Sequence, residues 1–173
     1  MKSRAGFAIV VCGVAAMVAS VAVVGRAEPQ TAAADSQQMP AGGPRMMAPK
    51  KALMGVIKPI GPYTPGVQNG PFVFLAGQVG IDPASNTLVE GGIKAETKQA
   101  MENLGKVLQE AGLSYQNVVK TTIFMADLKD FADMNEVYGS FFPAGSVAPV
   151  RSTVQVAAIP RSAHIEIDMI AMR

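Results

Sequence analysis

Apolar positions along the chain follow a helical period in two segments. From Ile93 to Ala111 apolar side chains recur every three or four residues, which predicts an amphipathic helix that ends at Gly112. A second helix is predicted after Asp130, a residue type favoured at helix N-caps. Its apolar face would carry Phe131, Met134, Val137, Tyr138 and Phe141.

Strand patterns surround these two helices. Residues 72–76 and 78–81 are rich in β-formers and are separated by Gly77, and residues 82–86 predict a turn. The β-branched segment Val118–Met125 predicts a strand in which Val119, Thr121, Ile123 and Met125 share a face. Apolar and polar residues alternate in 150–156 and again in 164–169, which predicts two further strands. The order of elements predicts an α+β fold, in which a single sheet carries two helices packed on one face.

The first 27 residues have a different pattern. Lys2 and Arg4 precede a long apolar run that ends in the small residues Gly25 and Ala27, as in a secretory signal peptide. We expect cleavage after Ala27 and export to the periplasm or the medium. The run is also long enough to cross a bilayer, so an uncleaved N-terminal anchor is the alternative, and only then would the protein contact a membrane.

Residues 28–53 are predicted to be a flexible linker, because this segment is rich in Ala, Gln, Pro, Gly and Met and lacks a strand or helix period. Residues 54–173 are predicted to be the folded domain. The formal charge is +2, and Lys2, Arg4 and Arg26 all precede the first acidic residue, Glu28. The remainder is therefore near neutral, which argues against a nucleic-acid partner. The chain has one Cys and one His, which excludes a zinc site of Cys and His ligands.

Candidate chemistry lies on the sheet face that the helices leave open. We expect this face to carry Arg151, Thr153, Gln155, His164, Glu166 and Asp168. Arg151 could bind a substrate carboxylate, or it could form a structural salt bridge with Glu166 or Asp168. Glu166 could activate water if burial raises its pKa, or it could be an ordinary solvated carboxylate. His164 is expected to be a surface residue.

Several motifs resemble the reactive-intermediate deaminase family, also called RidA or YjgF. The resemblance spans essentially all of residues 54–173 in the right order and spacing. The segments that carry it are Pro59–Tyr63 with Gly66, Ala76–Gly80, Val119–Phe124, Asp127–Ala132 with Asn135, Pro149 with Arg151–Ser152, Val154 and Val156–Ala157, Pro160, and Ile165–Asp168 with Ile170–Ala171.

The resemblance implies a chorismate-mutase-like fold that assembles as a homotrimer with clefts between subunits. It also implies hydrolysis of enamines and imines such as 2-aminoacrylate to a 2-keto acid and ammonia. Arg151 would bind the substrate carboxylate and Glu166 would hold or activate water. Tyr63 and the backbone of Gly77 would contact the imino acid or keto acid, and Asn135 would give structural support. The reaction needs no cofactor and no metal.

Two residues depart from the family pattern. Ala76 stands where Ser is frequent, and Thr153 stands where Cys is frequent. Three functions are therefore compared: an enamine or imine deaminase, a non-catalytic small-carboxylate binding protein of the same fold, and a nuclease. The near-neutral charge argues against the nuclease, because no basic surface would follow a phosphate backbone.

Overall fold

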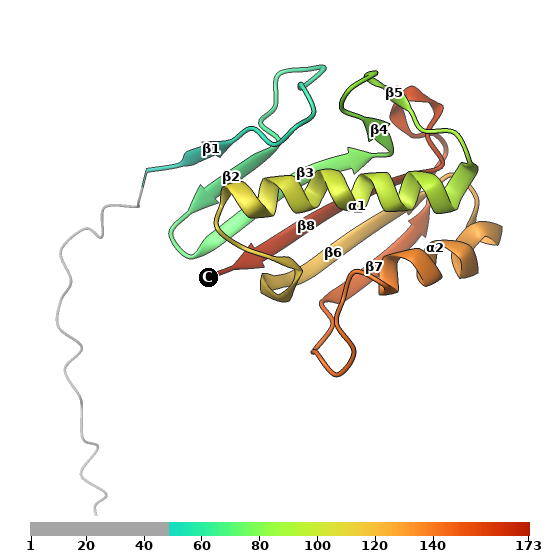
Figure 1. Cartoon of the computed structure of the whole chain (residues 1–173). Helices are drawn as coiled ribbons and strands as arrows, with labels where there is room; N and C mark the ends of the chain where they lie inside the picture. Colours follow the sequence, from blue (N-terminus) through green and yellow to red (C-terminus); the bar gives the residue numbers. More distant parts are fainter. Residues whose placement is uncertain (1–48) are drawn as a thin grey trace, which may run out of the picture. The chain divides into compact units, whose positions relative to one another are not determined.

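The computed structural model describes residues 49–173 (Figure 1). The predicted signal or anchor at 1–27 and most of the predicted linker lie outside these residues. Within 49–173, no helix has the length and apolar character needed to span a membrane.

A six-stranded mixed sheet forms the centre of the described domain, with strand order β1-β2-β3-β8-β6-β7 (Figure 1). Neighbouring strands are antiparallel except for β6 and β7, which are parallel. The strands of this sheet are Lys51–Leu53 (β1), Gly66–Asn69 (β2), Phe72–Val79 (β3), Val118–Met125 (β6), Val150–Gln155 (β7) and Ile165–Met172 (β8). The strands Ile81–Asp82 (β4) and Thr87–Leu88 (β5) form a separate hairpin.

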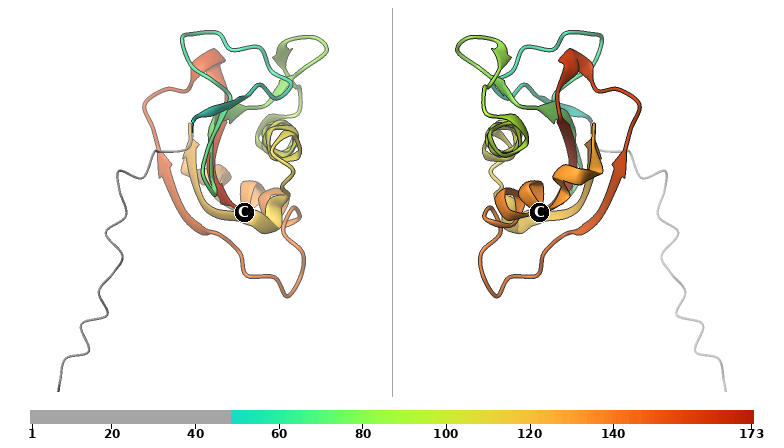
Figure 2. Two further views of the ribbon diagram at one scale, coloured as in Figure 1. Left: turned by 90° about the vertical axis from the view of Figure 1, so that its left-hand side faces the viewer. Right: turned by 90° about the vertical axis from the view of Figure 1, so that its right-hand side faces the viewer.

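Helices α1 (Gly92–Glu110) and α2 (Phe131–Gly139) cover the same face of the sheet (Figure 2). This arrangement confirms the predicted α+β class. Asp130 does precede α2, but its side chain makes no capping hydrogen bond. The core between helices and sheet contains many fully buried methionine and aliphatic side chains, among them Met101, Leu104, Ile123, Met125, Met134, Ile167 and Met169.

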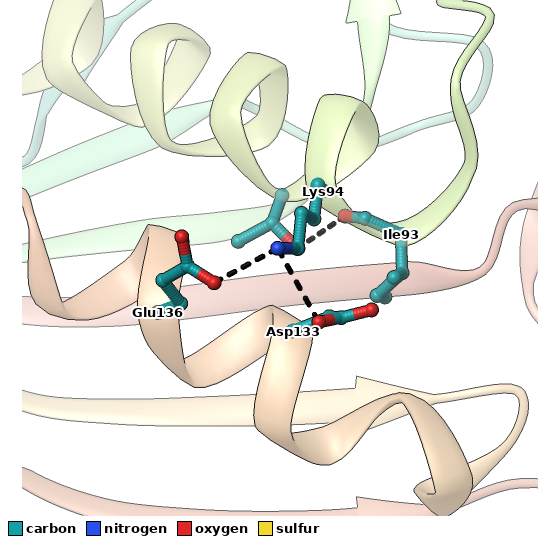
Figure 3. A network of polar contacts seen from close by, with 5 residues as sticks. Ile93, Lys94, Asp133 and Glu136 are labelled. Atoms are coloured by element: carbon teal, nitrogen blue, oxygen red, sulfur yellow. Dashed lines mark hydrogen bonds and ion pairs between the residues drawn. The ribbon is translucent and has the colours of Figure 1, made fainter.

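An ion-pair cluster joins the two helices (Figure 3). Lys94 Nζ on α1 lies 2.8 Å from Glu136 Oε2 and 3.4 Å from Asp133 Oδ1, both on α2. Hydrogen bonds and then the charges of these carboxylates raise the pKa of Lys94. All three side chains are exposed, so we expect the cluster to contribute little to stability.

Three local predictions are corrected by the structure. The predicted linker extended to Leu53, but Lys51–Leu53 is strand β1, because it pairs with β2 and fixes Leu53 in the core. The two predicted strands around Gly77 are one strand, β3, with a register shift between Leu75 and Gln78. Val119 is exposed instead of facing the core, because the register with β8 also shifts between Val118 and Lys120.

Candidate active site

Glu166 lies in a cleft of about 250 Å³ beside the end of β3. The cleft is lined by residues of three regions: Ile57, Lys58, Ile60 and Tyr63 before β2, Ala76, Gly77, Gln78, Val79 and Ile81 in and after β3, and Pro160, Arg161 and Glu166 near β8. Burial, and then the negative charge of Asp168, raises the pKa of the Glu166 carboxyl. The structure therefore brings together three predicted site residues, Tyr63, Gly77 and Glu166.

Gly77 makes room for the Glu166 carboxyl group. A Cβ atom at position 77 would lie 2.7 Å from the carboxyl carbon of Glu166 and would overlap its Oε1. Gly77 lies in the part of β3 where the register with β8 shifts, so the carboxyl group stands directly against the β3 backbone. A side chain at this position would displace the carboxylate from the cleft wall.

Arg151 lies at a second location, against α2. Its Nη1 donates a 2.7 Å hydrogen bond to Asn135 Oδ1, and its guanidinium carbon lies 5.0 Å from the centre of the Tyr138 ring and 5.6 Å from that of Phe131. These contacts orient the guanidinium, which still has other N–H donors for a carboxylate. Asn135 thus has a direct contact with Arg151.

Arg151 and Glu166 lie on opposite faces of the sheet, contrary to the sequence prediction. Arg151 pairs with Thr121 on β6, and the Thr121 side chain is buried beneath the helices. Glu166 pairs with Phe124 on the same strand. Because side chains alternate along a strand, positions 121 and 124 point to opposite faces, and so do their partners. The intervening strand β6 also separates β7 from β8, and no ion pair within residues 49–173 involves Arg151. The predicted salt bridge from Arg151 to Glu166 or Asp168 is therefore wrong.

Thr153 and Gln155, the two other β7 residues predicted on the open face, also face the helices. Thr153 aligns with Ile123 and Gln155 with Met125, so both share the face of Arg151. The Thr153 hydroxyl is buried and has no hydrogen-bond partner among the described residues. Ala76, the second departure from the family pattern, lines the Glu166 cleft.

His164 is half exposed but is not an isolated surface residue. Glu96 on α1 is almost fully buried, and its carboxylate accepts two hydrogen bonds from His164. The backbone N–H of His164 lies 2.7 Å from Glu96 Oε2, and ring Nδ1 lies 2.6 Å from Oε1. The hydrogen bond to Glu96, together with its charge, raises the pKa of His164. Sequence reasoning missed this pair because nothing in the sequence places residues 96 and 164 together.

Sequence reasoning also missed two cations of the Glu166 cleft, Lys58 and Arg161. Arg161 and Ser162 both have positive φ angles, 64° and 57°. Such angles are uncommon for residues other than glycine, and no glycine marks this turn in the sequence.

The fold and the carboxylate cleft define a class of small α+β domains, and comparison with known proteins identifies the family. The family model described as Endoribonuclease L-PSP matches residues 54–173, and the chain belongs to this family, which includes the YjgF and RidA proteins. The 2-iminobutanoate/2-iminopropanoate deaminase of Mus musculus is 48% identical over 114 residues, which cover 66% of this chain and 83% of the mouse protein.

Two solved structures from Escherichia coli have the same fold. The YjgF gene product is 36% identical with a TM-score of 0.67, and the match covers 71% of this chain and 98% of YjgF. TdcF, solved with bound serine, is 37% identical with a TM-score of 0.67, and the match again covers 71% of this chain and 98% of TdcF.

Proposed function

We propose that this protein hydrolyses reactive enamines and imines of the 2-aminoacrylate type to 2-keto acids and ammonia. The observation that carries the proposal is the position of the Glu166 carboxyl group. This group is half-buried, its pKa is raised, and it lies in a cleft where the absence of a side chain at Gly77 leaves room for it. The sequence similarity to a mammalian imine deaminase supports the same chemistry. The cleft and the similarity together favour catalysis of imine hydrolysis over the alternative, a protein that only binds small carboxylates.

The reaction requires a base, an anion-binding group and an electrophilic imine. Glu166 accepts a proton from water while the water oxygen bonds to the imine carbon and the C=N π electrons move to nitrogen. The imine carries its own proton as the iminium ion, so this addition gives a neutral carbinolamine. Glu166 then returns the water proton to the amine nitrogen, the C–N bond breaks, and ammonia leaves as the C=O bond of the keto acid forms. The hydroxyl proton of the carbinolamine passes back to Glu166 and from there to the departing ammonia, so the net products are the keto acid and ammonium. The raised pKa suits Glu166 to these proton transfers.

The substrate carboxylate is assigned to Arg151, and this assignment requires more than one subunit. Arg151 and Glu166 of one chain are on opposite faces of the sheet. We propose that in a homotrimer whose open sheet faces pack together, Arg151 of one subunit reaches the Glu166 cleft of its neighbour, because Arg151 lies on β7, an edge strand of the sheet. Exposed apolar side chains on this face support such packing, including Phe72, Phe74, Val150, Val154 and Met172.

The function is tested by ammonia release from imino acids generated by an amino acid oxidase, with the uncatalysed rate subtracted. We expect the full chain to accelerate release, and we expect Arg151→Lys to reduce kcat/KM by about 100-fold, because lysine lacks the planar fork that binds a carboxylate. Glu166→Gln should abolish turnover.

Lys98→Ala is the matched control, because Lys98 is an exposed cation on α1 that pairs with Glu102. It should leave the rate unchanged. No acceleration by the wild-type protein across several imino acids would contradict the proposal. A thermal shift with 2-keto acids in such an inactive protein would instead indicate the binding function.

A further inference from the structure

We propose that Glu96 and His164 form a pH-dependent positioning pair that holds the Glu166 cleft in its active shape; this inference rests on the proposed deaminase function. Neither residue lines the cleft. They are positioning residues, which act through the segments that carry the cleft walls.

Helix α1 anchors both walls of the cleft through two buried polar side chains. Asn103 Nδ2 donates hydrogen bonds to the carbonyl oxygens of Val79, at 3.3 Å, and Ile81, at 2.9 Å, which holds the β3 wall. Glu96 binds both the backbone N–H and the ring of His164, which immediately precedes β8. The second anchor therefore holds the segment between the turn at Pro160–Ser162 and Glu166.

The β3 wall also packs directly on Glu96. A Cβ atom at Gly80 would lie 2.5 Å from Glu96 Cα, so the backbone after β3 lies against this turn of α1. Glu96 is thus in contact with both walls at once. A movement of its side chain would shift His164, and with it Glu166, which is two residues further along.

Of these two anchors, the Glu96–His164 anchor contains titratable groups, whereas the Asn103 anchor contains none. The titratable groups that act on the His164 ring are Glu96 on α1 and, at longer range, Asp130 before α2. The adjoining end of β6 contributes a backbone contact, Ala126 N–H to the His164 carbonyl oxygen at 2.9 Å. The hydrogen bond to Glu96 and then its charge raise the pKa of His164 above its usual 6.5; burial opposes this increase, and the charge of Asp130 adds the smallest contribution. The ion pair is therefore complete at low pH and is lost as the pH rises through that raised pKa.

This predicts a bell-shaped pH dependence of kcat. The acid limb belongs to Glu166, which must be ionised to accept a proton, and the alkaline limb belongs to His164. We expect kcat to fall about 5-fold across the alkaline limb while KM changes by less than about 2-fold, because a displaced base slows chemistry more than binding.

The test combines kinetics with an NMR titration of the untagged full chain. His164 is the single histidine of the sequence, so its ring gives one titration curve. The midpoint of that curve should coincide with the alkaline limb of kcat. His164→Arg keeps a permanent cation opposite Glu96 and should remove the alkaline limb while leaving the acid limb. Glu96→Gln should give a flat, lower kcat across the same range.

Asn103→Ala is the control for a purely structural role, because it weakens the β3 anchor without removing a charge. It should lower kcat equally at all pH values and keep the shape of the profile. An active wild-type enzyme without an alkaline limb, or a His164→Arg profile identical to wild type, would overturn the inference alone. A wild-type protein inactive at every pH would overturn the proposed function together with the inference.

Discussion

At the scale of single residues, the cleft depends on a close contact between a backbone and a carboxyl group. Glu166 stands against the β3 backbone at Gly77, and its pKa is raised first by burial and then by Asp168. Arg151 is oriented by Asn135 and by the rings of Phe131 and Tyr138. Each of these arrangements can be changed by one substitution with a defined result.

Gly77→Ala should abolish most of the activity while the protein still folds. The added methyl group meets the movable end of the Glu166 side chain, which can turn away, so the loss of stability is small. The displaced carboxylate should lower kcat by about 100-fold. Gly139→Ala is the control for stability, because a Cβ atom there meets nothing within 4 Å beyond its chain neighbours and its own helix backbone. Kinetics and thermal unfolding of both variants check this, and a Gly77→Ala protein of wild-type activity would contradict the role of the contact.

Asp168→Asn should move the acid limb of the kcat/KM profile to lower pH. The charge of Asp168 is the second cause of the raised pKa of Glu166, and its removal leaves burial as the remaining cause. Because ionised Glu166 is the active form, the limb follows this pKa downward but stays above the usual value of 4.5. A pH profile of imine hydrolysis measures this change. An acid limb that stays at the wild-type pH or moves to higher pH would contradict the role of Glu166 as the base.

The sequence indicated which residues form the site, but it did not show which of them lie together in the structure. Motif resemblance indicated Tyr63, Gly77, Arg151 and Glu166, and the structure gathers Tyr63, Gly77 and Glu166 in one cleft. Arg151 was assigned to the wrong face, because the alternation in 150–156 does not reveal which face α2 covers. The apolar residues Val150 and Val154 of this edge strand are exposed on the open face, while Arg151 lies against α2.

At the scale of elements, long periodic segments were predicted closely and irregular backbone was not. The helix over 92–110 and the strand over 118–125 follow from their periods, since many residues report the same structure. The register shifts in β3 and β6 depend on pairing with β8, which is distant in the sequence. Strand β1 was missed because its three residues are too few to show a period and follow a Pro-rich segment.

Leu104→Ala should destabilise the domain by about 2–5 kcal/mol, because it removes a fully buried side chain between α1 and the sheet. Lys94→Ala should have a much smaller effect, because the ion pairs that it removes are exposed to solvent. Urea unfolding of both variants makes the comparison. A larger loss for Lys94→Ala than for Leu104→Ala would show that the helices are held to the sheet mainly by the ion pairs.

At the scale of the whole molecule, the domain leaves one sheet face open and divides its functional residues between two faces. We propose that both features reflect assembly through the open face, which would bury its exposed apolar side chains and would bring Arg151 of the edge strand β7 to a neighbouring Glu166 cleft. We also propose that the protein is exported, on the basis of the basic and apolar pattern of residues 1–27.

Export with cleavage after Ala27 predicts a mature chain that begins at Glu28. Intact-mass measurement of the protein from a periplasmic or secreted fraction checks this prediction. An intact N-terminus in a membrane fraction would indicate the alternative, an uncleaved anchor.

The central claim is that each active site takes Arg151 from one subunit and Glu166 from another. The most direct test mixes the inactive variants Arg151→Ala and Glu166→Gln at equal amounts, unfolds them together and refolds them into mixed assemblies. An intact site then needs an unmodified residue from each of two neighbouring subunits, so about one quarter of the wild-type activity should return. Activity no greater than that of the two variants measured separately, in assemblies shown to be mixed, would contradict the claim.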